Sequence, residues 1–274
     1  RVKGEINAML SGRGFTASHT IVACGAHSSM PHHSGEGPIY ADKPVVIDIF
    51  PRSQSSGYFG DMTRTVVRGV PSPALVKMYD TVLRGQKLAI GMIRAGVKVK
   101  DIHTAVVDYF KSRGFETGMI DGKMQGFIHS TGHGLGLEIH EPPRISMGDE
   151  VLEEGNVVTV EPGLYYEKTG GVRIEDVVVV EKGGSTNSRT CKSCRSCNGT
   201  RSELFLPSSP RPSLVPFLTI PALRNCIRRL QMPFLRRLFR RGRAPSIFSP
   251  CPGARAPACR CRNTCSIGKA RSSE

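Results

Sequence analysis

The chain has 274 residues and a formal net charge of +15. Residues 1–185 contain 20 Lys+Arg and 21 Asp+Glu, whereas residues 186–274 contain 18 and 2, so the two segments carry −1 and +16. The basic charge therefore belongs to the second segment, and we predict no nucleic-acid or membrane partner for residues 1–185. No run approaches the ~18 apolar residues of a membrane span, and no secretory signal opens the chain, so we expect a cytoplasmic protein.

The first predicted elements are strands. Residues 20–24 and 45–49 are short apolar runs, separated by a loop rich in Gly, Ser, Pro and His. Residues 58–68 follow a glycine-containing loop and are rich in β-forming residues, so we expect them to pair back on the strand at 45–49.

Two helices are predicted next, over residues 73–95 and 101–113. Each has apolar residues at helical spacing and a glycine after its last turn, at Gly96 and Gly114. The apolar positions of the first helix are Leu75, Met78, Tyr79, Val82, Leu83, Ala89 and Ile90. The second helix has Ile102, Ala105, Val106, Tyr109 and Phe110 on one face.

A second hairpin is predicted from residues 157–166 and 172–181, which are rich in valine and isoleucine. Each half of residues 1–185 thus supplies a β-ribbon, with helices between them. This order predicts an α+β fold in which helices cover one curved, pseudo-symmetric antiparallel sheet.

Each ribbon carries two acids inside apolar, β-forming sequence: Asp48 and Asp61 in the first, Glu161 and Glu175 in the second. Unpaired buried charge costs several kcal/mol, so a cation must compensate these carboxylates. The glycine-rich turn at 129–141 adds histidines. Carboxylates with an imidazole suit Mn²⁺, Co²⁺, Zn²⁺ or Fe²⁺, and two such ions ~3.5–4 Å apart can share a hydroxide. The pattern therefore predicts metal-assisted hydrolysis of an amide.

Three motifs resemble those of the pita-bread metallopeptidases, within the creatinase and methionine aminopeptidase superfamily. They are residues 61–65 (Asp-Met-Thr-Arg-Thr), residues 131–141 (Thr-Gly-His-Gly-Leu-Gly-Leu-Glu-Ile-His-Glu) and residues 172–176 (Val-Arg-Ile-Glu-Asp). The resemblance covers roughly residues 5–183 and is strongest to Xaa-Pro aminopeptidases and Xaa-Pro dipeptidases (prolidases). It implies the pita-bread fold and a homodimer in the full-length protein.

The resemblance also implies roles for individual residues. The implied metal ligands are Asp48, Asp61, His133, Glu161 and Glu175. Asp61 and Glu175 would bridge two divalent ions, with Mn²⁺ preferred over Co²⁺, Zn²⁺ or Fe²⁺. Glu161 would also act as general base for a hydroxide held by both metals. The implied substrate-binding residues are His32, His129, His140 and Arg173, and the substrate would be a peptide with proline at its second position.

Two departures from the family pattern stand out. The interval from Asp48 to Asp61 is longer than is usual, which a hairpin loop tolerates easily. The family has an N-terminal domain and a long helix before the segment that resembles this chain, so we interpret Arg1 as the start of a fragment that lacks the N-terminal part. Two alternatives stay open: a methionine aminopeptidase-like hydrolase, and a catalytically inactive binding protein on the same fold.

Other conspicuous residues have plainer interpretations. His103 lies off the apolar stripe of its helix, so we expect it to be solvated, and His33 is expected to serve only its loop. Cys24 is expected to be a small buried hydrophobe. The glycines of the 131–141 motif are expected to allow close backbone approach to the metals.

The segment 186–274 is a basic tail rich in Arg, Ser, Pro and Cys. We interpret it as disordered or as an out-of-frame extension, because the family pattern stops abruptly after Gly184. A basic amphipathic segment and a zinc site at Cys191, Cys194 and Cys197 are the functional alternatives.

Overall fold

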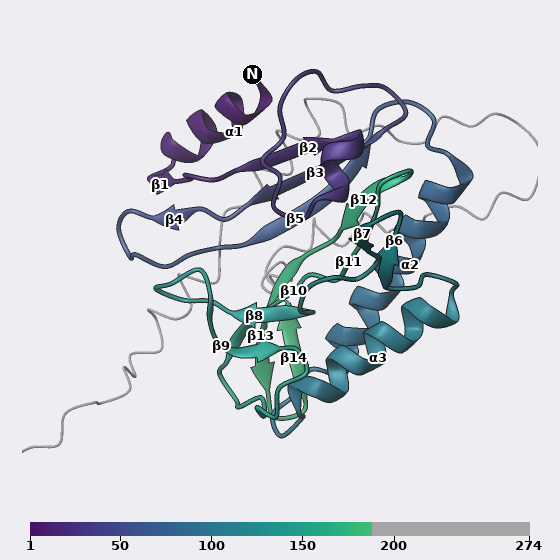
Figure 1. The fold of residues 1–274 in the computed structure, drawn as a ribbon. Helices are drawn as coiled ribbons and strands as arrows, with labels where there is room; N and C mark the ends of the chain where they lie inside the picture. Colours follow the sequence, from purple (N-terminus) through teal and green to yellow (C-terminus); the bar gives the residue numbers. More distant parts are fainter. Residues whose placement is uncertain (188–274) are drawn as a thin grey trace, which may run out of the picture.

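The computed structural model of the chain describes residues 1–187, which form a mixed helix and sheet structure (Figure 1). Of the predicted tail, only Thr186 and Asn187 are described, and they belong to a strand; the remaining predictions for the tail, including the cysteine run, lie outside the described residues. Within residues 1–187, no helix combines the length and the apolar character that crossing a membrane requires.

The first half is built on an antiparallel three-stranded sheet with the order β2-β3-β5. Its strands are β2 (Ile21–Cys24), β3 (Pro44–Ile49) and β5 (Met62–Val67). The predicted hairpin is therefore confirmed, although its second strand begins at Met62 because the preceding loop is longer than expected. The register places Asp48 opposite Thr63. Helix α1 (Val2–Ser11) packs on this sheet through Ile6 and Leu10.

Smaller elements flank this sheet. Strand β1 (Phe15–Thr16) pairs with β4 (Arg52–Ser53), and the short 3-10 helix η1 (Gly25–Ser29) follows β2. Figure 1 shows α1, β1 and β4 at one side of the molecule, away from the two long helices.

The second half contains a five-stranded antiparallel sheet with the order β14-β13-β10-β8-β9. Its strands are β8 (Gly132–Gly134), β9 (Glu141–Ile145), β10 (Val157–Val160), β13 (Asp176–Glu181) and β14 (Gly184–Asn187). The predicted second hairpin is confirmed, but each of its strands is divided in two. The outer parts, β11 (Gly163–Tyr166) and β12 (Gly170–Arg173), form a separate ladder.

Each strand of this hairpin is divided next to one of the predicted metal ligands. Pro162 follows β10 and has no N–H to donate to a ladder, so the strand bends there. Glu161 and Glu175 lie at this break, one on each strand of the hairpin. The hydrogen-bonded ladders therefore replace the one continuous sheet that we expected, and the bend turns both carboxylates toward the first half.

Helices α2 (Pro73–Met92) and α3 (Val99–Ser112) pack together on the second sheet (Figure 1). The Ser72 side chain accepts the backbone N–H of Leu75, and Pro73 occupies the first turn, where a missing N–H costs nothing. Helix α2 ends earlier than predicted because Ile93 takes an extended conformation. A small hairpin of β6 (Gly118–Ile120) and β7 (Lys123–Gln125) follows α3.

The two halves meet where β5 lies against β12. The Thr65 hydroxyl donates to the backbone oxygen of Arg173 at 2.9 Å and accepts its N–H at 3.0 Å. The backbone N–H of Glu175 donates to the Thr63 oxygen at 3.1 Å. These bonds set both acid-bearing hairpins at one place, as the pseudo-symmetric fold requires.

Candidate metal centre

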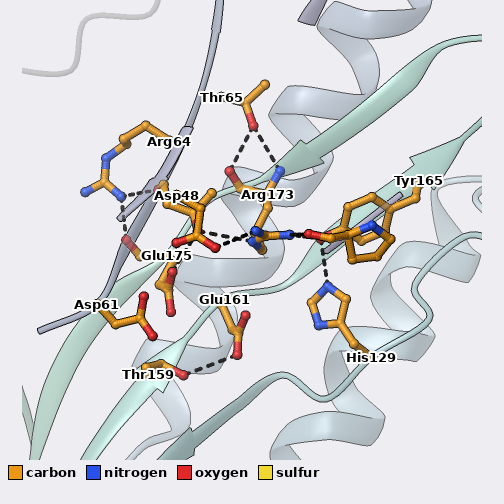
Figure 2. Close-up of polar contacts among 12 residues, drawn as sticks. Asp48, Asp61, Arg64, Thr65, His129, Thr159, Glu161, Tyr165, Arg173 and Glu175 are labelled. Carbon is orange, nitrogen blue, oxygen red and sulfur yellow. Dashed lines mark hydrogen bonds and ion pairs between the residues drawn. The ribbon is translucent and has the colours of Figure 1, made fainter. Parts of the chain in front are cut away.

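The four predicted carboxylates converge between the two halves. Asp48 comes from β3, and Asp61 directly precedes β5. Glu161 follows β10, and Glu175 precedes β13. Figure 2 shows all four side chains directed into one shared space. The structure therefore brings together residues that lie up to 127 positions apart in the sequence.

His133 completes this group. One donor atom each of Asp61, His133 and Glu175 lie within 4.8 Å of one another. The Nε2 atom of His133 is 3.3 Å from Glu161 Oε1 and 3.7 Å from Asp61 Oδ2. All five residues that the sequence suggested as metal ligands thus surround one centre.

The imidazole of His133 is held in the form that binds metals. Its Nδ1 is 3.0 Å from the backbone oxygen of Gly134, which can only accept, so Nδ1 carries the proton. The lone pair is therefore on Nε2, which faces the carboxylates. Burial lowers the pKa of His133 to about 4, so the ring is neutral at physiological pH. The Thr159 hydroxyl accepts the backbone N–H of His133 at 3.0 Å and fixes the strand.

The carboxylates repel one another at this distance and are shielded from water. Burial, followed by the charges of neighbouring carboxylates, raises the pKa of Asp61 and Glu175 well above their ordinary values. Burial also raises the pKa of Glu161, to about 7. In addition, the buried Asp48 Oδ1 has no hydrogen-bond partner within residues 1–187. An orphaned oxygen in a cluster of hard donors fits divalent cations.

Arg173 supplies one positive charge beside this cluster, and its side chain is almost fully buried. Nη2 donates to Asp48 Oδ2 at 2.7 Å, and Nε donates to the Thr63 hydroxyl at 3.1 Å. Nη1 donates to the Tyr165 hydroxyl at 2.9 Å and to the Pro31 oxygen at 3.1 Å. One guanidinium offsets one carboxylate, so the remaining three are compensated either by protons or by bound cations.

His129 lies at the far end of the same chain of hydrogen bonds (Figure 2). Its Nδ1 donates to the Ser130 oxygen at 2.8 Å, so Nε2 accepts the Tyr165 O–H at 2.8 Å. Burial lowers the pKa of His129 to about 3 and raises that of Tyr165 to about 12. The sequence analysis did not single out Tyr165. A tyrosine within a predicted buried strand could have indicated it, because a buried hydroxyl needs a hydrogen-bond partner.

The other two predicted histidines, His32 and His140, are exposed and lie near the centre. The His140 ring packs edge-on against His133 with 4.3 Å between ring centroids. His32 is exposed, and its charge contributes to lowering the pKa of both His129 and His140, although burial is the larger cause. His32, His129 and His140 therefore lie near one another, and His140 contacts the proposed ligand His133.

Comparison with known proteins places this arrangement in a family. Residues 2–182 match the sequence model of metallopeptidase family M24. The chain belongs to this family. Among its relatives, an Xaa-Pro dipeptidase of Pyrococcus furiosus is 40% identical over 185 residues, which is 67% of this chain and 50% of the relative. The chain thus spans about half the length of the curated M24 relatives that it matches.

Solved structures agree with this assignment. The prolidase from Pyrococcus furiosus superposes with a TM-score of 0.62 at 38% identity, covering 68% of this chain and 53% of that one. The X-Pro aminopeptidase from Thermotoga maritima gives 0.57 at 36% identity, covering 64% and 46%. The predicted pita-bread fold is therefore confirmed for this M24 chain.

Two of the motif glycines are required by close backbone packing. A Cβ atom at Gly132 would lie 1.9 Å from the Thr159 oxygen, and one at Gly134 would lie 2.4 Å from the Pro142 oxygen. These glycines let β8 approach neighbouring backbone. The expectation that they allow close backbone approach to the metals stays a prediction, and the close packing of β8, which carries His133, is a further reason for glycine at these positions.

The expectation for His103 was wrong. The side chain is partly buried, and its Nδ1 lies 2.8 Å from the Thr131 hydroxyl. Helical periodicity showed the face of α3 that meets the sheet, but not the segment 127–131 that covers the adjacent face. In contrast, His33 serves its loop by accepting the Gly35 N–H, and Cys24 is buried, as predicted.

Proposed function

We propose that this chain forms the catalytic site of a metal-dependent Xaa-Pro peptidase, an aminopeptidase or dipeptidase that cleaves between an N-terminal residue and proline. The observation that carries the proposal is the convergence of four carboxylates on an imidazole whose unprotonated Nε2 faces them. The names of the similar proteins, Xaa-Pro dipeptidase and X-Pro aminopeptidase, support the choice of substrate.

Five side chains would hold two divalent ions, with Mn²⁺ as the first choice: Asp48, Asp61, His133, Glu161 and Glu175. Bound there, the ions would lower the pKa of a water molecule and polarise the scissile carbonyl. The oxygen-rich donor set favours Mn²⁺ over metals that prefer thiolates. The homodimer of the full-length protein and its cytoplasmic location remain predictions.

Glu161 is proposed as the general base. Its carboxylate lies next to His133 and is held by the Thr159 hydroxyl at 3.4 Å. It accepts the proton that the attacking water loses and returns it to the proline nitrogen as the peptide bond breaks. A carboxylate within reach of the attacking water can make both transfers.

Arg173 and Tyr165 are proposed to hold the side chains of the site in position. Four N–H groups of Arg173 are already committed to fixed partners, so it holds Asp48 in place rather than moving to a substrate. His32 and His140 are exposed, unlike Arg173 and Tyr165, and are proposed to contact the peptide. His129, whose Nε2 is an acceptor in this structure, would bind substrate after exchanging its bond to Tyr165.

The test combines metal analysis with substrate choice. Purified protein is incubated with Mn²⁺, dialysed, and analysed by mass spectrometry of its metals, then assayed with Ala-Pro and Met-Ala peptides. We expect bound divalent metal and preferential cleavage of the Ala-Pro bond. A folded protein that takes up no divalent metal would refute the proposal. Preference for Met-Ala would instead favour a methionine aminopeptidase-like enzyme.

A further inference from the structure

We infer that His103 of α3 is a positioning residue for the metal centre, acting through Thr131. This inference deepens the proposed function and rests on it. His103 touches none of the proposed ligands. Its Nδ1 lies 2.8 Å from the Thr131 hydroxyl, and its ring packs against Phe127 with 5.3 Å between centroids.

Thr131 is the midpoint between two functional histidines, two residues after His129 and two before His133. Its side chain is fully buried. Its backbone N–H donates to Ile145 at 2.8 Å, and its backbone oxygen accepts the N–H of Glu161 at 2.8 Å. A shift of Thr131 would therefore move the backbone of the proposed base, Glu161, and the segment that carries His129 and His133.

The side chain of Thr131 is held in place by its hydrogen bond to His103. Within residues 1–187, it is the one hydrogen bond recorded for the Thr131 hydroxyl. A buried hydroxyl must place its hydrogen on an acceptor, so Thr131 donates and Nδ1 of His103 accepts. Burial lowers the pKa of His103 and so favours the neutral ring that this direction requires.

A purely packing role for the His103 ring is the competing explanation, and side-chain geometry separates the two. Asparagine places an acceptor near the position of Nδ1, whereas glutamine places its amide near Nε2. If Nδ1 is what matters, His103→Asn restores the anchor and His103→Gln does not. Helix propensity acts in the opposite direction, because glutamine is the better helix former. Rescue by asparagine therefore cannot come from a more stable helix.

The experiment compares His103→Asn, His103→Gln and His103→Leu with wild type. We expect His103→Leu and His103→Gln to weaken Mn²⁺ binding and lower kcat, each by about tenfold, with KM within about twofold of wild type. His103→Asn should stay within about threefold of wild type in both. The control is Lys100→Asn against Lys100→Gln, at an exposed position of the same helix. Equal effects of asparagine and glutamine at position 103, or no effect of leucine, would overturn the inference.

Hydrogen exchange of the Glu161 amide gives a readout that needs neither metal nor turnover. Its N–H bonds to Thr131, so it should exchange about tenfold faster in His103→Leu than in wild type or His103→Asn. If no variant or wild type cleaves Ala-Pro, the proposed function fails, but this exchange still tests the anchor. Unchanged exchange in His103→Leu would refute it.

A double-mutant cycle guards against general destabilisation. Thr131→Val removes the hydroxyl while keeping the branched shape, and Thr131→Ser keeps the hydroxyl. If the two side chains act through one bond, His103→Leu with Thr131→Val should be no worse than either change alone. Losses that multiply to about 100-fold would show independent roles and overturn the inference.

Discussion

Two groups in residues 1–187 bring histidine and acid together, yet they differ in what they can bind. The group Asp61, His133 and Glu175 and the group His27, His33 and Glu36 each have donor atoms within 4.8 Å of one another. In the first, Nδ1 of His133 donates to a backbone oxygen, which leaves Nε2 free to bind a cation. In the second, Nδ1 of His33 accepts the N–H of Gly35 at 2.9 Å, so the proton of the neutral ring is on Nε2.

Ring geometry and burial separate the two groups further. The rings of His27 and His33 stack face to face, 4.1 Å apart and 13° from parallel, so their nitrogen lone pairs run side by side instead of converging. Glu36 is exposed and is solvated without a metal. The comparison teaches that residue type does not define a metal site. A metal site is defined by the backbone group that fixes each imidazole tautomer and by the burial that makes charge compensation necessary.

The largest expected difference between the two groups is catalytic. Glu161→Gln removes both a proposed ligand and the proposed base, so we expect kcat for Ala-Pro to fall by at least about 100-fold. The matched change at the second group, Glu36→Gln, should leave kcat unchanged. Steady-state kinetics on both variants checks this. Unchanged turnover in Glu161→Gln would refute its role, and an equal loss in Glu36→Gln would erase the distinction between the groups.

Metal affinity is the next largest difference. Loss of outer partners of a ligand alone weakens binding by about 10–100-fold, so His133→Asn should weaken Mn²⁺ binding by at least about 100-fold. His33→Asn, in the stacked pair, should leave the affinity and the number of bound ions as in wild type. Equilibrium dialysis with metal analysis measures both. Loss of one bound ion per chain in His33→Asn would show that the second group also binds metal.

The dependence of metal affinity on pH sharpens the comparison within the centre itself. Burial raises the pKa of Glu161 to about 7, so below pH 7 a metal must displace its proton. Burial lowers the pKa of His133 to about 4, so this imidazole does not compete above pH 5. The Glu161 proton alone should therefore lower the affinity about fivefold as the pH drops from 7 to 6, and protons on Asp61 and Glu175, whose pKa values are also raised, should add to the fall. Calorimetry in two buffers would detect the released proton, and an affinity independent of pH would contradict this.

The sequence predicted much of this centre because its constraints are local. The apolar, β-forming sequence around Asp48, Asp61 and the two glutamates indicated that these acids are carried by two hairpins, and the resemblance to a family implied that they act together. The start of α2 follows from Ser72 and Pro73. The break in the second hairpin was predictable as well, since Pro162 lies within the predicted strand.

What the sequence did not predict depends on local backbone geometry and on contacts between distant segments. The different tautomers of His133 and His33 are set by the backbone groups nearby, Gly134 O and Gly35 N–H, which no residue pattern reveals. The contact of His103 with Thr131 requires the segment 127–131 to cover one face of α3. The bond from Arg173 to Asp48 spans 125 residues and exists because β12 crosses beside β3. Local backbone geometry decides the tautomers, and tertiary packing decides the other two contacts.

The smallest expected difference concerns stability in acid, and it again separates a buried histidine from an exposed one. Burial lowers the pKa of His129 to about 3, well below its value of about 6.5 in the unfolded chain. The unfolded state therefore binds a proton that the folded state refuses. The contribution of neutral His129 to the free energy of unfolding is therefore complete above pH 6.5 and is lost as pH falls toward 3, at up to about 1 kcal/mol per pH unit.

In metal-free protein, His129→Gln should reduce this loss, since glutamine can still accept the Tyr165 O–H and does not titrate. His32→Gln, at an exposed position, should leave the pH dependence as in wild type. Urea unfolding at pH 7, 6 and 5 measures the difference, and parallel curves for wild type and His129→Gln would show that His129 is protonated as readily in the folded protein as in the unfolded one.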